Sequence, residues 1–241
     1  MLSGSCSQGR SLPNHRRNEL CSQVNLERLR NGLPMRRFLG LGLLLLVPLW
    51  AAAAETYRWN DRQGDRAIVN HPAVPKAPAL AKAFKARFFP DPERLHDPDY
   101  LIEWETTVEV GRSTGHYYSA VSRGLTLYKD SKGQMVGAHP GKILDTLTWD
   151  LRKNHEVTLE MLIEKAQFAK LARLIGDHAE APEAFSAQAH YGFYLRKEGV
   201  AFYDPDAPHV AFGVESVVPY AELLALAAPH SPLLDSTLTG H

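Results

Sequence analysis

The chain of 241 residues is poor in cysteine, with Cys6 and Cys21 as its only two. Both come before a long apolar segment that ends near residue 54. The chain after that segment therefore has no disulfide, no thiol nucleophile and no cysteine ligand for a metal. The absence of a cysteine directly after the apolar segment also excludes a lipoprotein of the lipobox type.

Positive charge is also scarce outside the first part of the chain. Residues 1–54 hold seven of the 27 basic residues and two of the 27 acidic ones, so the rest carries a formal charge of −5. A mildly acidic chain without a basic stripe argues against binding to nucleic acid or to an anionic membrane surface. It suits a basic protein partner.

Recognisable catalytic motifs are missing as well. The sequence has no phosphate-binding loop, no dinucleotide fingerprint, no nucleophile elbow and no pair of histidines at metal-binding spacing. The sequence therefore predicts no catalytic residue, no cofactor and no metal site. An enzyme is less expected than a binding domain.

Residues 35–54 have the pattern of a secretory signal peptide. Arg36 and Arg37 precede an apolar run that ends at Trp50, and small residues follow as far as Ala54. This order of basic, apolar and small regions predicts export with cleavage after Ala54. An uncleaved anchor is the alternative, and it is the only membrane contact that the sequence predicts. Export of a cysteine-free chain favours a Gram-negative periplasm.

Residues 1–34 are polar and rich in arginine, and they show no hydrophobic periodicity. Such a segment cannot bury enough apolar area to offset the entropy of ordering, so we expect it to be disordered. Signal peptides rarely carry so long a prefix, which makes Met35 a plausible start and residues 1–34 an artefact of start-site choice. A cytoplasmic tail on an anchor is the alternative.

Three further segments surround the main domain. Residues 55–72 hold two β-prone runs on either side of Gly64, which predicts a small hairpin. Residues 73–99 are rich in proline and alanine, so we expect a linker in which only Ala79–Phe89 forms a helix. Residues 229–241 carry no pattern and are expected to fray.

Residues 100–228 show the clearest periodicity. Apolar and polar residues alternate from Tyr100 to Val110, which predicts a half-buried strand, and His116–Thr126 is expected to pair with it. Helical spacing predicts one long amphipathic helix from Thr158 to Ile175. The stretch from Tyr191 to Leu226 is typical of a hairpin followed by a short helix.

Three motifs within this domain carry a family resemblance. In order along the chain they are Gly137-Ala138-His139-Pro140 followed by Val157-Thr158-Leu159-Glu160-Met161-Leu162, then Phe193-Tyr194-Leu195 with Gly199 to Pro205, then Val217-Val218-Pro219-Tyr220-Ala221-Glu222-Leu223. Together they resemble an exported domain of unknown function. This domain forms the C-terminus of the lysozyme-sensing anti-sigma factor RsiV and accompanies the catalytic domain of the peptidoglycan deacetylase PdaC.

The resemblance covers roughly Tyr100 to Leu226 and implies an α+β fold. We expect a mixed or mostly antiparallel sheet with helices packed on one side, after the signal peptide and the small hairpin. The resemblance also implies residence in the cell envelope and, in the RsiV branch, recognition of lysozyme through protein contact. It does not imply an enzyme. Residues Tyr57, Trp59, Asp61 and Gly64 additionally resemble a small module of secreted bacterial envelope proteins.

The candidate binding residues are one histidine and several tyrosines. His139 lies in a glycine-flanked turn, where the backbone can approach a ligand, and local hydrogen bonding that holds the loop is the alternative. The residues expected to shape this turn are Gly137, Ala138 and Pro140.

The four candidate tyrosines are Tyr118, Tyr194, Tyr203 and Tyr220. They lie in or beside predicted strands, where alternation directs some side chains outward, and exposed tyrosine is a frequent interface anchor. Packing in the core is the alternative for each.

These observations favour a non-catalytic periplasmic binding domain of the cell envelope. Its expected partner is a lysozyme-like protein or a peptidoglycan fragment. A hydrolase or deacetylase-type enzyme is the second hypothesis, and it requires His139 and a nearby carboxylate to converge in a pocket. A structural factor in envelope assembly is the third.

Overall fold

The computed structural model describes residues 54–239 except for 75, 96, 186–189 and 209–210. The predictions for the N-terminal prefix, for the body of the signal peptide and for both cysteines fall outside the described residues. Within the described part, no helix combines the length and the apolar character needed to cross a membrane.

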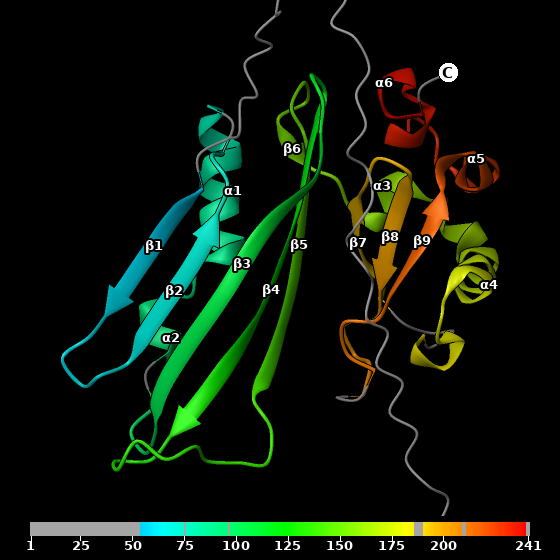
Figure 1. The fold of residues 1–241 in the computed structure, drawn as a ribbon. Helices are drawn as coiled ribbons and strands as arrows, with labels where there is room; N and C mark the ends of the chain where they lie inside the picture. The colour runs from blue at the N-terminus through cyan, green and yellow to red at the C-terminus, as the bar shows by residue number, and fades with distance from the viewer. Residues whose placement is uncertain (1–53, 75, 96, 186–189, 209–210, 240–241) are drawn as a thin grey trace, which may run out of the picture. The chain divides into compact units, whose positions relative to one another are not determined.

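The described chain forms two β-sheets and several short helices, which is an α+β fold as predicted (Figure 1). The first sheet has six strands in chain order: β1 (Glu55–Asn60), β2 (Arg66–His71), β3 (Leu101–Ser113), β4 (Tyr117–Lys129), β5 (Gly141–Asp150) and β6 (His155–Glu156). The second sheet is antiparallel and comprises β7 (Gly192–Leu195), β8 (Gly199–Tyr203) and β9 (Glu215–Pro219).

Short helices connect and cover these strands. The α-helices are α1 (Pro78–Phe88), α2 (Pro92–Leu95), α3 (Leu159–Leu162), α4 (Phe168–His178), α5 (Tyr220–Leu223) and α6 (Ser236–Thr239). The 3₁₀ helices are η1 (Lys165–Gln167), η2 (Pro182–Ala184), η3 (Leu224–Leu226) and η4 (Pro232–Leu234).

The six-stranded sheet is mixed because one neighbouring pair is parallel. All its pairs are antiparallel except β2 and β3, which run in the same direction. Parallel neighbours need a crossover connection, and the chain between them contains α1 and α2. The predicted N-terminal hairpin is present as β1 and β2, and β2 joins it to the strands of the main domain.

Helix α1 forms where the sequence predicts it and packs on the sheet. Its buried side chains are Leu80, Phe84 and Phe88, which recur every four residues and so share one face. They belong to a core cluster with Tyr118 from β4 and Leu147 from β5. The proline-rich segment thus contributes a helix to the hydrophobic core.

The second sheet has a core on each of its faces. Val200 and Phe202 of β8 point toward the C-terminal helices, in a cluster that includes Leu171 and Ile175 of α4. The alternate residue Ala201 joins a cluster with Val121 of β4 and Leu144 of β5, and this cluster connects the two sheets. Successive strand residues point to opposite faces, so both faces of β8 are buried.

The prediction of one long helix from Thr158 to Ile175 is wrong. The helical pattern is broken at Ile163 and Glu164, whose backbones are extended with ψ of 135° and 129°. The Glu164 N–H donates to the Leu226 carbonyl at 2.9 Å, and the Ala228 N–H donates to the Leu162 carbonyl at 3.2 Å. Pairing with a distant segment therefore replaces the helical hydrogen bonds that the local pattern favours.

The prediction that the chain frays from Pro229 onward is also wrong for the described residues of that segment. Leu233 and Leu238 are 0% and 2% exposed in the C-terminal core. Asp235 anchors the segment, because its Oδ2 lies 2.7 Å from Arg152 Nη2 and 3.0 Å from His116 Nδ1. Two isolated leucines carry too little periodicity to be recognised in the sequence.

This anchor makes stability depend on pH. Burial raises the pKa of Asp235, but hydrogen bonds from Thr237 and His116 and the charge of Arg152 outweigh it and lower the pKa from 3.8 to about 2. A carboxylate with a lowered folded-state pKa stabilises the fold above its unfolded pKa, and this contribution is lost as pH falls through the folded pKa.

We therefore predict that Asp235→Asn lowers the melting temperature near neutral pH and that the difference from wild type shrinks as pH falls toward about 2. Thermal melts across this range test it. Asp99→Asn, at an exposed aspartate, serves as the matched control and should leave the melting temperature unchanged. A difference in melting temperature between wild type and Asp235→Asn that stays constant with pH would contradict an origin in the lowered pKa of Asp235.

A second prediction concerns the contact between the sheets. A Cβ atom on Gly111 of β3 would lie 2.4 Å from the Leu195 carbonyl oxygen of β7, so Gly111→Ala forces the two backbones apart. We expect a loss of about 1–3 kcal/mol in the free energy of unfolding, measured by urea titration. Gly115→Ala is the control, because nothing lies within 4 Å of the added methyl group.

Candidate functional site

All four candidate tyrosines are buried. Tyr118, Tyr194, Tyr203 and Tyr220 are 1%, 3%, 5% and 6% exposed. Tyr118 packs beneath α1, Tyr194 and Tyr203 lie between the two sheets, and Tyr220 lies in the C-terminal core. Their rings form no exposed patch, so core packing describes their positions.

Tyr194 is part of a polar network between the sheets. Arg123 of β4 donates from Nη2 to the Tyr194 hydroxyl at 3.0 Å and also contacts Glu215 of β9. The Tyr194 hydroxyl donates to the second Glu215 oxygen at 2.9 Å, and the Arg123 guanidinium lies 5.6 Å from the Tyr194 ring centre. Burial raises the pKa of Tyr194, which keeps the hydroxyl protonated as a donor.

His139 lies in the exposed loop between β4 and β5. Gly137, in the same loop, has a positive φ of +97°. The structure pairs other histidines with carboxylates: His116 with Asp235 at 3.0 Å, and His178 with Glu222 at 3.0 Å. Each of these pairs joins two separate elements of the fold.

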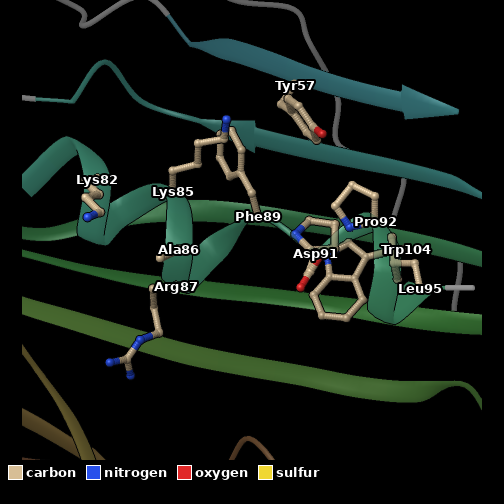
Figure 2. A pocket seen from close by; sticks show the side chains of 11 residues that line it. Tyr57, Lys82, Lys85, Ala86, Arg87, Phe89, Asp91, Pro92, Leu95 and Trp104 are labelled. Atoms are coloured by element: carbon tan, nitrogen blue, oxygen red, sulfur yellow. The ribbon is translucent and has the colours of Figure 1, made fainter.

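A pocket of about 750 Å³ lies beside α1 (Figure 2). We call it the α1 pocket. Its lining residues are Tyr57, Lys82, Lys85, Ala86, Arg87, Phe89, Pro90, Asp91, Pro92, Leu95 and Trp104. They come from β1, from α1 and the turn after it, from α2 and from β3. The pocket therefore exists only because the crossover helices pack against the sheet.

Aromatic rings form much of the pocket wall. The Tyr57 and Phe89 rings stack with their centres 4.6 Å apart and their planes at 27°. Trp104 lies at the other end, near Asp91 and Leu95 (Figure 2). Its Nε1 atom is buried and has no hydrogen-bond partner among the described residues. Such a wall suits the flat or apolar face of a ring-shaped ligand.

Basic side chains of α1 border these rings. Lys82 and Lys85 are exposed, and neither makes an ion pair within the described part of the chain. Arg87 is different, because its Nη2 lies 2.8 Å from Glu156 Oε1. Figure 2 shows Lys85 on the side of Tyr57 and Phe89, with Arg87 directed away from the rings. The positive charge left to the pocket therefore belongs to the lysines.

The side chains of the pocket are mainly aromatic and basic. It offers stacking surfaces and ammonium groups, which together suit a ring with a negative substituent. Among the described residues, no group of three or more His, Cys, Asp or Glu side chains is placed to hold a metal ion.

The sequence contained a partial signal for this pocket. Ala79–Phe89 is recognisable as a basic helix bounded by prolines, and Trp104 lies on the apolar side of the alternating strand. Tyr57 and Phe89 are 32 positions apart, and no local pattern indicates that their rings stack. The pocket was missed because its parts meet only through the crossover between β2 and β3.

A second surface gathers exposed apolar side chains at and beside the loops that precede β3 and follow β4. Tyr100, Tyr128 and Met135 are 38%, 41% and 48% exposed, and the two tyrosine rings meet edge to face at 6.4 Å. Met135 is adjacent because it pairs with the backbone of Lys129. We call these three residues the loop-end patch. Asp97, Asp99 and Asp130 lie in the same loops.

Comparison with known proteins gives a match in structure but none in sequence. No protein-family model and no curated protein matches the chain. A member of the DUF3298 family from Bacteroides fragilis matches with a TM-score of 0.53 at 14% identity, covering 79% of this chain and 98% of its own. The chain has the DUF3298 fold.

A second DUF3298 family protein, from Pseudomonas aeruginosa, matches with a TM-score of 0.46 at 14% identity, covering 74% of this chain and 93% of its own. DUF3298 is the domain that RsiV and PdaC share, so the resemblance based on the three motifs is confirmed at the level of the fold. DUF3298 remains a domain of unknown function, and a likeness at 14% identity transfers no activity.

The burial of Tyr194 leads to a prediction about its role. Tyr194→Phe removes the hydroxyl that links Arg123 to Glu215 and leaves a partly buried charge pair with one partner fewer. We expect the free energy of unfolding to fall by about 1–2 kcal/mol in urea titrations. Tyr128→Phe, at an exposed tyrosine, is the control and should be neutral. An unchanged stability in Tyr194→Phe would contradict a structural role.

Proposed function

We propose that this chain is a non-catalytic binding domain of the cell envelope, exported to the periplasm, and that it holds a peptidoglycan fragment in the α1 pocket. The observation that carries the proposal is the meeting of stacked aromatic rings and lysines in one cavity of about 750 Å³. Its size is within the range of about 300–1,000 Å³ that is usual for small-molecule sites.

Peptidoglycan fragments match the two chemical features of the pocket. Their amino-sugar rings present apolar C–H faces, which stack on aromatic side chains such as Tyr57 and Trp104. Their lactyl and peptide carboxylates are attracted by ammonium groups such as that of Lys85. A protein as basic as lysozyme would be repelled by the same lysines, so the pocket favours the cell-wall ligand.

The enzymatic alternative receives less support. It requires His139 and a carboxylate in a shared pocket, whereas His139 is exposed on the β4–β5 loop and is absent from the lining of the α1 pocket. The lining of the α1 pocket consists mainly of lysines and aromatic rings, which suit stacking and charge attraction, and its one carboxylate, Asp91, has no histidine beside it in that lining. Binding is therefore the function that this geometry favours.

The loop-end patch supports a lysozyme-like protein as a second candidate partner. Aromatic residues and methionine are enriched in protein interfaces, and Tyr100, Tyr128 and Met135 are exposed together. The aspartates of the same loops would complement a basic protein. This surface and the α1 pocket share no residue, so the two candidates can be tested independently.

Calorimetric titration of the purified protein with soluble muropeptides and, separately, with c-type lysozyme tests both candidates. We expect saturable binding of muropeptides and a loss of about tenfold in affinity for Tyr57→Ala, whose ring forms part of the pocket wall. Tyr128→Ala is the matched control and should bind muropeptides like wild type. Thermal melts confirm that each variant is folded.

The outcomes separate the two partners. Lysozyme binding that is weakened by Tyr128→Ala and unchanged by Tyr57→Ala would move the function to the loop-end patch. If neither muropeptides nor lysozyme gives a heat of binding, the proposed function is contradicted and only the assignment of the fold stands.

A further inference from the structure

We propose that the α1 pocket discriminates by charge and binds sugars that carry a carboxylate more tightly than neutral sugars of the same size. The ammonium group of Lys85 contacts the carboxylate. This inference rests on the proposed function, because it specifies which part of a cell-wall fragment the pocket recognises. It predicts recognition of the muramic-acid unit, which has a lactyl carboxylate, in preference to the glucosamine unit.

The ring platform next to Lys85 is held in place before a ligand arrives. Tyr57 belongs to β1, and Phe89 directly follows α1, where its N–H donates to the Lys85 carbonyl at 3.1 Å. Both rings also pack against the core cluster beneath α1. A platform fixed by a strand and a helix loses little entropy on binding, so stacking positions a sugar ring reproducibly.

The position of Lys85 relative to this platform follows from the helix. The hydrogen bond from Phe89 to Lys85 closes the last helical turn, so the two side chains emerge close together at the C-terminal end of α1. Figure 2 shows Lys85 on the side of Tyr57 and Phe89. A substituent of a ring stacked there lies within reach of the flexible lysine side chain.

The other charged residues of the lining are Lys82, Arg87 and Asp91, and Asp91 lies near Trp104, at the other end of the pocket from Tyr57 and Phe89 (Figure 2). Arg87 is engaged by Glu156 at 2.8 Å, and Lys82 lies one turn earlier on α1. The negative end of the α1 dipole disfavours an anion near this terminus, and the basic residues of the last turn, Lys85 and Arg87, offset it. A ligand carboxylate is therefore stabilised only through direct contact with a lysine.

The expected preference is moderate. Lys85 is exposed, and solvent screens an exposed ion pair, so we expect about a three- to tenfold advantage for the charged sugar. This advantage should decrease at high salt. A neutral sugar should still stack on Tyr57 and Phe89, with an affinity that does not depend on Lys85.

A pair of disaccharides that differ in one substituent tests this inference. The disaccharide of N-acetylglucosamine and N-acetylmuramic acid carries the lactyl carboxylate, and di-N-acetylchitobiose lacks it. Ligand-observed NMR titration of the full protein measures both affinities at low and high salt. Lys85→Gln should abolish the preference and leave the neutral disaccharide unaffected. Lys132→Gln, at an exposed lysine of the β4–β5 loop, should change neither affinity.

The outcomes distinguish this inference from the proposed function. If wild type and Lys85→Gln bind the charged disaccharide with the same affinity, charge selection by Lys85 is overturned. The binding of cell-wall fragments then still stands. If Lys132→Gln loses as much of the preference for the charged disaccharide as Lys85→Gln does, the preference comes from the overall charge of the protein. That result would also overturn the role of Lys85. Failure of both disaccharides and of muropeptides to bind would overturn the proposed function itself.

Discussion

The close approach of the three-stranded sheet to β3, β4 and β5 is the contact on which the rest of the structure depends. At Gly111 the two backbones lie so near that a methyl group would meet the Leu195 carbonyl oxygen at 2.4 Å. Buried polar groups cross the same contact: the Leu195 N–H donates to Ser119 Oγ at 2.8 Å, and Ser119 Oγ lies 2.7 Å from Thr148 Oγ1. Since unpaired buried polar groups are costly, these bonds hold the sheets in one arrangement.

This arrangement decides which surfaces are left for binding. Alternate residues of β4 point to opposite faces, so Val121 faces the second sheet while Tyr118 packs under α1. Both faces of β4 are thereby covered, and Tyr118 is part of the core. Open surface remains where α1 and α2 meet β1 and β3, which is the α1 pocket, and at the loops that form the loop-end patch.

The residues of the proposed ligand site therefore come mainly from the crossover between β2 and β3 and not from the three motifs. The motifs that indicate DUF3298 mark positions of packing, such as Tyr194 between the sheets and Tyr220 in the C-terminal core. The pocket instead uses residues 57–104, most of which lie before the region of resemblance. A fold with one packing core can take different ligands through such peripheral segments, which is why the shared fold alone does not name a ligand.

The sequence by itself determined the strands and α1, because a period of two in Tyr100–Val110 and of four in Leu80, Phe84 and Phe88 reflects burial of one face. It also indicated the DUF3298 fold through three short motifs. Only the tertiary structure decided where the helix after Thr158 breaks, that the C-terminal leucines are buried and that Tyr57 stacks on Phe89. Each of these depends on partners dozens of residues away, and local periodicity carries no information about such contacts.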